Sequence, residues 1–349
     1  MRLERRETQS AWLMLAAPLA AVAVALVLSG GLIALSGASV PEAFRRIAIG
    51  AFGSRLAITE TLTRATPLIL TGLAVAVAFR ARVWNIGAEG QLYLGAVAAV
   101  AVGATNPLGL PAPLLVLVVA AAGAVAGALL LVLPVALRLR FAVDEVVTTL
   151  LLNFIVLLFV SMMIEGPMKD PLAFGWPASV PVDDAATLPH LVERSRLHAG
   201  LILALVMAVV VQYVMTRTVF GLEARATGHN PAAARFAGVP VGRTLLKVAA
   251  LSGGLAGLAG AIEVMGVKGY VTTDLSPGFG YAGIIVAMLA NLSPVGVVGA
   301  AIFSAAIFVG ADSMGRAMGV PSFIADVTVA LALLTMLVAL LLTTYRIRR

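Results

Sequence analysis

The sequence predicts an all-α fold, a polytopic transmembrane helical bundle with about ten spans. Its 349 residues are 61% hydrophobic and only 12% charged, and the mean hydropathy is +1.04. Ordinary soluble domains carry about 25% charged and about 45–50% apolar residues. The apolar residues also form long unbroken runs such as Leu114–Leu133. In lipid, such runs satisfy their backbone groups only as helices, so a bundle of membrane-spanning helices follows.

The spans are placed where apolar stretches approach the length that a membrane helix needs, about 20 residues. We expect them at 11–37, 65–79, 87–104, 112–137, 145–164, 199–216, 246–266, 281–291, 294–311 and 322–344. Together they make one transmembrane domain, residues 1–349.

The basic residues predict the orientation of this bundle. Most of the 24 Lys and Arg residues fall in segments that share one side of the membrane if the N-terminus is cytoplasmic. Cytoplasmic loops are enriched in Lys and Arg, so we expect both termini inside, which requires an even number of spans. The net charge of +7 therefore reflects topology. It indicates membrane lipid as a partner and no nucleic acid.

Two outer connections are predicted. Residues 38–64 place Phe44 and Ile47 on one helical face and charged residues on the other. This amphipathic pattern is typical of a helix that lies in the membrane interface, so we expect an outer interfacial helix there. Residues 165–198, rich in proline and charge, are expected to form an outer loop.

Residues 217–247 form the only long loop on the predicted cytoplasmic side. Asn230 is a good N-cap, Pro231 suits the first helical position, and Gly238 followed by Pro240 ends the helix. We therefore expect a helix of about two turns outside the membrane. It could insert into the groove of a partner protein, or it could be a linker resting on the lipid headgroups.

The predicted helices are interrupted in the two halves of the chain. Glycine and polar residues break the apolar pattern between Phe79 and Gly90, and again between Ile284 and Gly299. Paired short, interrupted segments point to a substrate path at the membrane midplane. The alternative is a pair of tight turns between ordinary spans.

Several polar side chains fall at membrane depth, where a charged group costs about 2.5–3.5 kcal/mol on insertion scales. The helix dipole could stabilise Glu89 near the start of its span, and Asn153 and Asn291 could join helices by hydrogen bonds. Glu263, near the outer end of a glycine-rich helix, has no such simple explanation. The candidates for a substrate pathway are Asn85, Glu89, Gln91, Asn153, Glu263 and Asn291.

Glycine spacing predicts one tight helix contact. Gly253, Gly257 and Gly260 lie on one face of the helix within 246–266. Small residues at this spacing let two membrane helices approach closely.

No catalytic, metal or cofactor site is predicted. The chain has no cysteine, its three histidines lack metal-ligand spacing, and no Gly-x-x-x-x-Gly-Lys-Ser/Thr phosphate loop occurs. The chain is therefore expected not to hydrolyse ATP by itself. The competing classes are an intramembrane enzyme, which would need paired acids or a nucleophile–base pair, and an ATPase-independent secondary transporter.

The run Asn-Ile-Gly-Ala-Glu-Gly-Gln at 85–91, inside 71–95, resembles permease subunits of bacterial ABC importers. This superfamily serves branched-chain amino acids, simple sugars and nucleosides, and the run is most similar to its nucleoside-type branch. The segments 221–238 and 274–291 resemble the same family. The resemblance covers nearly the whole chain after the first span.

The resemblance implies an import path for a small polar solute, most directly nucleosides, with ribose-like simple sugars as the alternative. It implies an ABC ATPase subunit that hydrolyses ATP, a second permease (a paralogue or a second copy), an extracytoplasmic substrate-binding protein, and a place in the bacterial inner membrane. The pathway positions that it implies are Asn85, Glu89, Gln91, Asn153 and Asn291. The implied ATPase contacts are Gly221, Glu223, Arg225, Gly228, Asn230 and Ala233.

Overall fold

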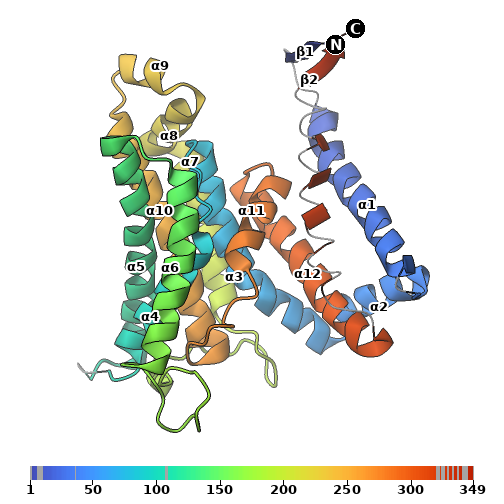
Figure 1. The fold of residues 1–349 in the computed structure, drawn as a ribbon, viewed down its shortest axis with the longest axis vertical. Helices are drawn as coiled ribbons and strands as arrows, with labels where there is room; N and C mark the ends of the chain where they lie inside the picture. Colours follow the sequence, from blue (N-terminus) through green and yellow to red (C-terminus); the bar gives the residue numbers. More distant parts are fainter. Residues whose placement is uncertain are drawn as a thin grey trace.

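The chain folds mainly into α-helices, which confirms the predicted all-α class (Figure 1). A computed structural model describes residues 2–5, 11–35, 37–106 and 109–319, and, beyond these, 323, 327, 330–331, 334–335, 338–339 and 345–348. The helices are α1 (Ala11–Leu35), α2 (Val40–Phe52), α3 (Arg55–Arg80), α4 (Ala88–Gly103), α5 (Ala112–Phe141), α6 (Glu145–Glu165), the 3₁₀ turn η1 (Asp184–Ala186), α7 (Gly200–Arg217), α8 (Val219–His229), α9 (Pro231–Phe236), α10 (Val241–Glu263), the π-helical turn η2 (Val264–Lys268), α11 (Phe279–Leu289) and α12 (Pro294–Met318).

Two short strands, β1 (Arg2–Arg5) and β2 (Tyr345–Arg348), pair antiparallel and bring the ends of the chain together. They lie at the same end of the molecule as α8 and α9 (Figure 1).

Six helices among the described residues are long and apolar enough to cross a membrane: α3, α5, α6, α7, α12 and α10 with its continuation η2. The number is seven if α1 and α2, which meet at 118°, form one broken span. The chain is therefore a multi-pass membrane protein. The predicted span at 322–344 lies largely outside the described residues, and the total of ten stays a prediction.

The segment 38–64 differs from the single interfacial helix that its pattern predicts. It contains all of α2 and the first turns of α3, separated at Gly53 and Ser54. Ser54 starts α3 because its hydroxyl accepts a hydrogen bond from the Ala57 amide (3.1 Å). α3 then continues without a break to Arg80, so the span predicted to start at residue 65 begins ten residues earlier. The amphipathic pattern at 55–64 reflects packing against the bundle.

Helices α4 and α11 are too short to cross a bilayer. Their 16 and 11 residues span about 24 Å and about 16 Å, against a hydrocarbon core of about 30 Å. Each follows a non-helical segment, 81–87 or 269–278, that returns into the bundle. Their N-termini meet there, since the Gly280 amide donates to Oε2 of Glu89 (2.6 Å). From this junction α4 runs toward one end of the molecule and α11 toward the other (Figure 1).

The first predicted interruption thus coincides with the break before α4. The second interruption lies earlier in the chain than the predicted one, because the segment that re-enters the bundle is 269–278. The predicted region 284–299 contains instead the short turn 290–293 between α11 and α12.

The two halves of the chain contain the same order of elements, and their half-helices, α4 and α11, run in opposite directions (Figure 1). α3, the re-entrant segment 81–87, α4 and α5 follow one another in the first half. α10 with η2, the segment 269–278, α11 and α12 follow one another in the second. α3 packs against α11 and α12, as α10 packs against α4 and α5. Paired, interrupted elements of this kind are the pattern from which the sequence predicts a solute path, and that path stays a prediction.

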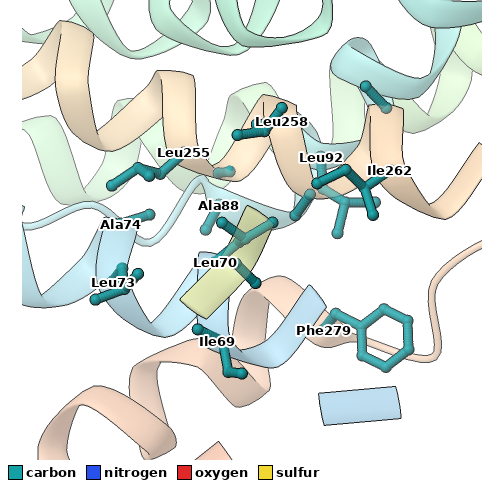
Figure 2. Packing of buried hydrophobic residues seen from close by; sticks show 14 of the residues in the cluster. Ile69, Leu70, Leu73, Ala74, Ala88, Leu92, Leu255, Leu258, Ile262 and Phe279 are labelled. Carbon is teal, nitrogen blue, oxygen red and sulfur yellow. The ribbon is translucent and has the colours of Figure 1, made fainter. Parts of the chain in front are cut away.

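The core lies where these elements meet. Figure 2 shows buried side chains of α3, α4, α10 and α11 packed together, among them Leu73, Leu92, Leu255 and Phe279. Close to this core, α10 contacts α5 and α4 through glycines. A Cβ atom at Gly257 would meet backbone atoms of Gly127 at 2.9 Å, which confirms the close helix approach that the glycine spacing predicts.

Candidate functional site

A network of buried amides lies around the first chain break. The side chains of Asn85 and Gln91 donate to each other, over 2.9 Å and 2.8 Å. The Asn85 amide also donates to Oγ of Ser252 (3.1 Å), and that hydroxyl donates to the Ala74 carbonyl (2.7 Å). The network therefore joins the start of α4 to the middle of α10 and to α3.

Asn153 of α6 holds the same break from the other side. Its carbonyl oxygen accepts from the Gly90 amide (2.9 Å), and its amide donates to the Ile86 carbonyl (2.9 Å) and to the Tyr281 hydroxyl (3.2 Å). Each polar atom of the Asn153 side chain thus has a protein partner, as a buried amide requires.

Glu89 and Ser276 occupy the N-terminus of α11. The Ser276 hydroxyl accepts from the amides of Gly278 (3.1 Å) and Phe279 (2.9 Å). Glu89 accepts from the next amide, that of Gly280. A helix N-terminus carries unpaired amides and positive potential, and here side chains of the protein satisfy both.

Four of the six predicted pathway residues therefore lie together. Asn85, Glu89, Gln91 and Asn153 are all buried, and each bonds to the protein itself. Glu89 lies in the first turn of its own helix, α4, where the sequence predicts its stabilisation by the dipole, and it also accepts a hydrogen bond at the N-terminus of α11. A role of these residues in a substrate pathway stays a prediction. Asn291 lies apart, exposed in the turn between α11 and α12 with φ +49°.

The sixth residue, Glu263, lines a cavity of about 530 Å³. We call it the outer cavity because it lies at the end of the bundle that the sequence predicts to face outward. The cavity lies between α3, α12, the end of α10 with η2, and the segment 166–199. Its wall consists of Leu56, Glu60, Thr63, Arg64, Arg196, Glu263, Val267, Lys268, Asp274, Leu275, Pro277, Phe279, Val309, Asp312 and Arg316. One residue of this wall, Phe279, is the first residue of α11, so the cavity reaches the helix that takes part in the junction of the two half-helices.

Ion pairs brace the wall of the outer cavity. Arg64 pairs with Asp312 across α3 and α12 (2.6 Å), and Nε of Arg196 donates to Glu60 (3.0 Å). The wall contains four acidic and four basic residues, so it carries no net charge. The sequence does not predict these ion pairs, because the two partners of each pair are far apart in the chain. Arg64 and Arg196 also fall outside the segments in which most of the Lys and Arg residues lie, so they give no signal for a site.

Backbone hydrogen bonds fix the segment 166–199 over this end of the bundle. The Val182 amide donates to the Gly269 carbonyl (2.8 Å), and the Leu188 amide donates to the Met265 carbonyl (2.9 Å). His198 anchors the end of the segment, with Nδ1 accepting from the Gly200 amide (3.1 Å). This anchoring holds Arg196 at the cavity.

The anchor makes stability depend on pH. Burial, with a smaller effect of the nearby His190, lowers the pKa of His198 from 6.5 to about 4. Between these values the unfolded chain binds the proton and the folded chain does not, so stability falls as pH decreases from about 6.5 to about 4.

We expect thermal unfolding in detergent to show this decrease and His198→Gln to reduce its slope, since glutamine keeps an acceptor but does not titrate. His229→Gln, at an exposed histidine of α8, is the matched control and should keep the wild-type slope. An unchanged slope in His198→Gln would contradict the assignment.

At the opposite end of the bundle, the segment 217–247 contains two short helices, α8 and α9, of which α9 is the helix that the sequence predicts. Asn230 caps α9 by accepting from the amides of Ala232 (3.0 Å) and Ala233 (3.1 Å), as its sequence predicts. Phe236 is 97% exposed.

The other residues implied as ATPase contacts mostly hold α8 in place. Glu223 accepts from the Thr244 hydroxyl (3.2 Å), and Arg225 donates to the Met215 carbonyl. Gly221 and Gly228 are buried where α8 approaches the backbone of α7 and α3. Asn230 and Ala233 are exposed.

A multi-pass bundle with two half-helices meeting inside it, and a polar cavity that reaches one of them, is the architecture of a membrane transport protein. Residues 57–341 match the family described as "Branched-chain amino acid transport system / permease component", and the chain belongs to this family.

Three curated relatives are similar over most of their lengths. The glucose ABC transporter permease TsgB13 of Haloferax volcanii is 35% identical, over 99% of this chain and 93% of its own. The guanosine ABC transporter permease NupP of Bacillus subtilis is 35% identical, over 91% of each chain. The nucleoside ABC transporter permease NupB of Lactococcus lactis is 31% identical, over 90% and 88%. No solved structure matches the chain.

The family confirms the resemblance seen in the sequence. The chain is the membrane-embedded permease subunit of an ABC importer, which has no catalytic role of its own and works with a separate ATPase. This assignment sets aside the intramembrane enzyme and the ATPase-independent transporter.

Proposed function

We propose that this chain forms half of the import path for a neutral, ribose-bearing solute, most directly a nucleoside. The observation that carries the proposal is the closed N-terminus of α11. In carriers with broken helices, the open N-terminus of a half-helix receives the carboxylate of the substrate. Here Ser276 and Glu89 already accept from those amides. This favours a solute without a carboxylate over an amino acid.

The charge of the outer cavity is in keeping with a solute that carries no net charge. A site for an anion or a cation focuses one sign of potential, whereas this wall has equal numbers of acidic and basic residues. Its volume of about 530 Å³ lies within the range of small-molecule sites, about 300–1,000 Å³.

The relatives narrow the class. NupP and NupB are named for guanosine and nucleosides, which favours nucleosides. TsgB13 is named for glucose, so a simple sugar is the second candidate. Both solutes are neutral and rich in hydroxyl groups.

We further infer ten spans in the bacterial inner membrane with both termini inside, in which the segment 81–87 with α4, and the segment 269–278 with α11, make one crossing each. The pairing of β1 with β2, at the same end of the molecule as α8 and α9, supports the placement of both termini on one side of the membrane (Figure 1). Arg80, Arg82, Arg138 and Arg140 lie at the ends of helices that point the same way, in keeping with a cytoplasmic side.

The partners that we propose are an ABC ATPase, a second permease (a paralogue or a second copy) and an extracytoplasmic binding protein. The ATPase would dock on α8 and α9. Closure of the ATPases would move this end of the bundle and switch the path between its two openings. Such switching requires different contacts in the two states and no chemistry in the permease.

Uptake in a strain deleted for this chain tests the substrate. Labelled nucleosides, ribose and leucine are compared in the deletion strain, with and without the chain supplied from a plasmid. We expect nucleoside uptake to depend on the chain. If only ribose uptake depends on the chain, the substrate is a simple sugar. If only leucine uptake depends on the chain, the proposal of a substrate without a carboxylate is contradicted.

A further inference from the structure

We propose that Glu263, assisted by Lys268, recognises the vicinal hydroxyl groups of the solute in the outer cavity. The inference rests on the proposed function, because it deepens the description of the same path. A vicinal diol is shared by ribonucleosides and simple sugars, so a diol site would serve either candidate substrate.

Glu263 is a buried acid whose carboxyl group faces the cavity without a fixed protein partner. It is 6% exposed and lies in the cavity wall. Among the described residues, none lies within hydrogen-bond or ion-pair distance of its carboxyl oxygens. Buried polar groups are normally hydrogen-bonded, and an unmade bond of this kind is costly. The carboxyl group of Glu263 is therefore available to bind a molecule that enters the cavity.

Of the three basic residues near Glu263, two already form ion pairs with residues that the structure describes and one does not. The positive charges of Lys268, Arg196 and Arg64 act on its carboxyl group. Arg196 and Arg64 are already paired with Glu60 and Asp312. Within the described part of the chain, Lys268 has no such ion pair. Asp274 and Arg316 also line the cavity without an ion pair to any described residue, and Lys268 acts on Asp274 as well. Among the charged groups that act on each other around Glu263, Glu263 itself and Lys268 are the acceptor and donor left for a ligand.

The π-helical turn η2 explains why these two residues share the cavity. Residues five apart lie on the same face of a π-helix, and Glu263 and Lys268 bracket η2 in this way. In a regular α-helix they would diverge around the axis. Single π-helical turns inside α-helices occur frequently at functional sites.

The chemistry of this pair fits hydroxyl groups on adjacent carbons. A carboxylate has two oxygens that accept hydrogen bonds, and an ammonium group only donates. Each hydroxyl both donates and accepts, so a diol can donate to Glu263 and accept from Lys268. Hydrogen bonds to charged groups are shorter and stronger than neutral ones. Three apolar residues of the wall can contact the less polar part of the solute. They are Leu275, Phe279 and Val309.

The test compares two substrates in the assembled transporter, with its ATPase, partner permease and binding protein in proteoliposomes. The probes are a ribonucleoside and its 2′,3′-dideoxy analogue. We expect wild type to prefer the ribonucleoside and Glu263→Gln to lose about tenfold of this preference, as the loss of a hydrogen bond to a charged group predicts. The same binding protein serves both variants, so its own selectivity cancels in the comparison.

Lys268→Gln is the second variant, and it should reduce the preference in the same direction. Glu193→Gln removes an exposed carboxylate outside the outer cavity and should keep the wild-type preference. If Glu263→Gln and Lys268→Gln slow both probes equally, their role is structural and the inference is overturned. If wild type takes up nucleosides without preferring the diol, the inference fails while the proposed function stands. If wild type takes up neither nucleosides nor sugars, both fail.

Discussion

We expect Gly257→Ala to lower strongly the amount and the thermal stability of the folded protein. A methyl group at this position would overlap backbone atoms of Gly127 and Gly123 in α5. Backbone atoms cannot rotate away as the end of a side chain can, so α10 and α5 must separate along their contact. Overpacking a fitted core costs about 1–3 kcal/mol, and close approach is what holds membrane helices together.

Gly254→Ala is the matched control, since it adds the same methyl group to the same helix three residues away. The nearest atom to a Cβ there is the Ala124 carbonyl oxygen at 3.5 Å, an ordinary contact. Melting curves followed by size-exclusion chromatography in detergent should show wild-type behaviour for Gly254→Ala and early unfolding for Gly257→Ala. Equal curves for the two variants would contradict the described packing.

The second large effect concerns coupling to the ATPase. We expect Phe236→Asp to abolish ATP-dependent uptake while the permease itself stays folded. The side chain is 97% exposed at the end of α9, so its replacement disturbs little inside the chain. A large aromatic residue at the centre of an interface typically contributes about 2 kcal/mol or more, which is about thirtyfold in affinity. Co-purification of the ATPase and uptake should both decrease.

Phe174→Asp is the control for this variant. Phe174 is 100% exposed in the segment 166–199, away from α9, and its replacement should leave ATPase binding intact. The resemblance to the permease family suggests Arg225 as an ATPase contact, but Phe236 is the more specific probe. Arg225 donates to the Met215 carbonyl, so a charge reversal there would disturb the join between α7 and α8 as well. Normal ATPase binding by Phe236→Asp would contradict docking through α9.

Local signals in the sequence predict much of this fold. The apolar runs locate the long helices because lipid forces every backbone group to pair within its own segment. The cap of α9 follows from Asn230 and Pro231, whose preferences act within a few residues. The glycine spacing of α10 predicts a close contact, although it does not name α5 as the partner.

The sequence predicts less where partners are distant. The re-entrant segment 269–278 carries no strong apolar signal, and the break was expected further along the chain. Arg64 and Asp312 are 248 residues apart, so no local pattern connects them or the outer cavity. Polarity at membrane depth identified Asn85 and Asn153 as unusual. It could not distinguish hydrogen bonds within the protein from contact with a solute, because both satisfy the same groups.

We propose that this chain is half of a path driven by a separate ATPase and used by a neutral ribose-bearing solute. The most direct test of this proposal is uptake of a labelled nucleoside into proteoliposomes that contain the chain and its partner permease, supplied with binding protein. We predict uptake only when the ATPase and ATP are both present, and competition by unlabelled nucleoside but not by leucine. Equal uptake without the ATPase, or competition by leucine alone, would contradict the account.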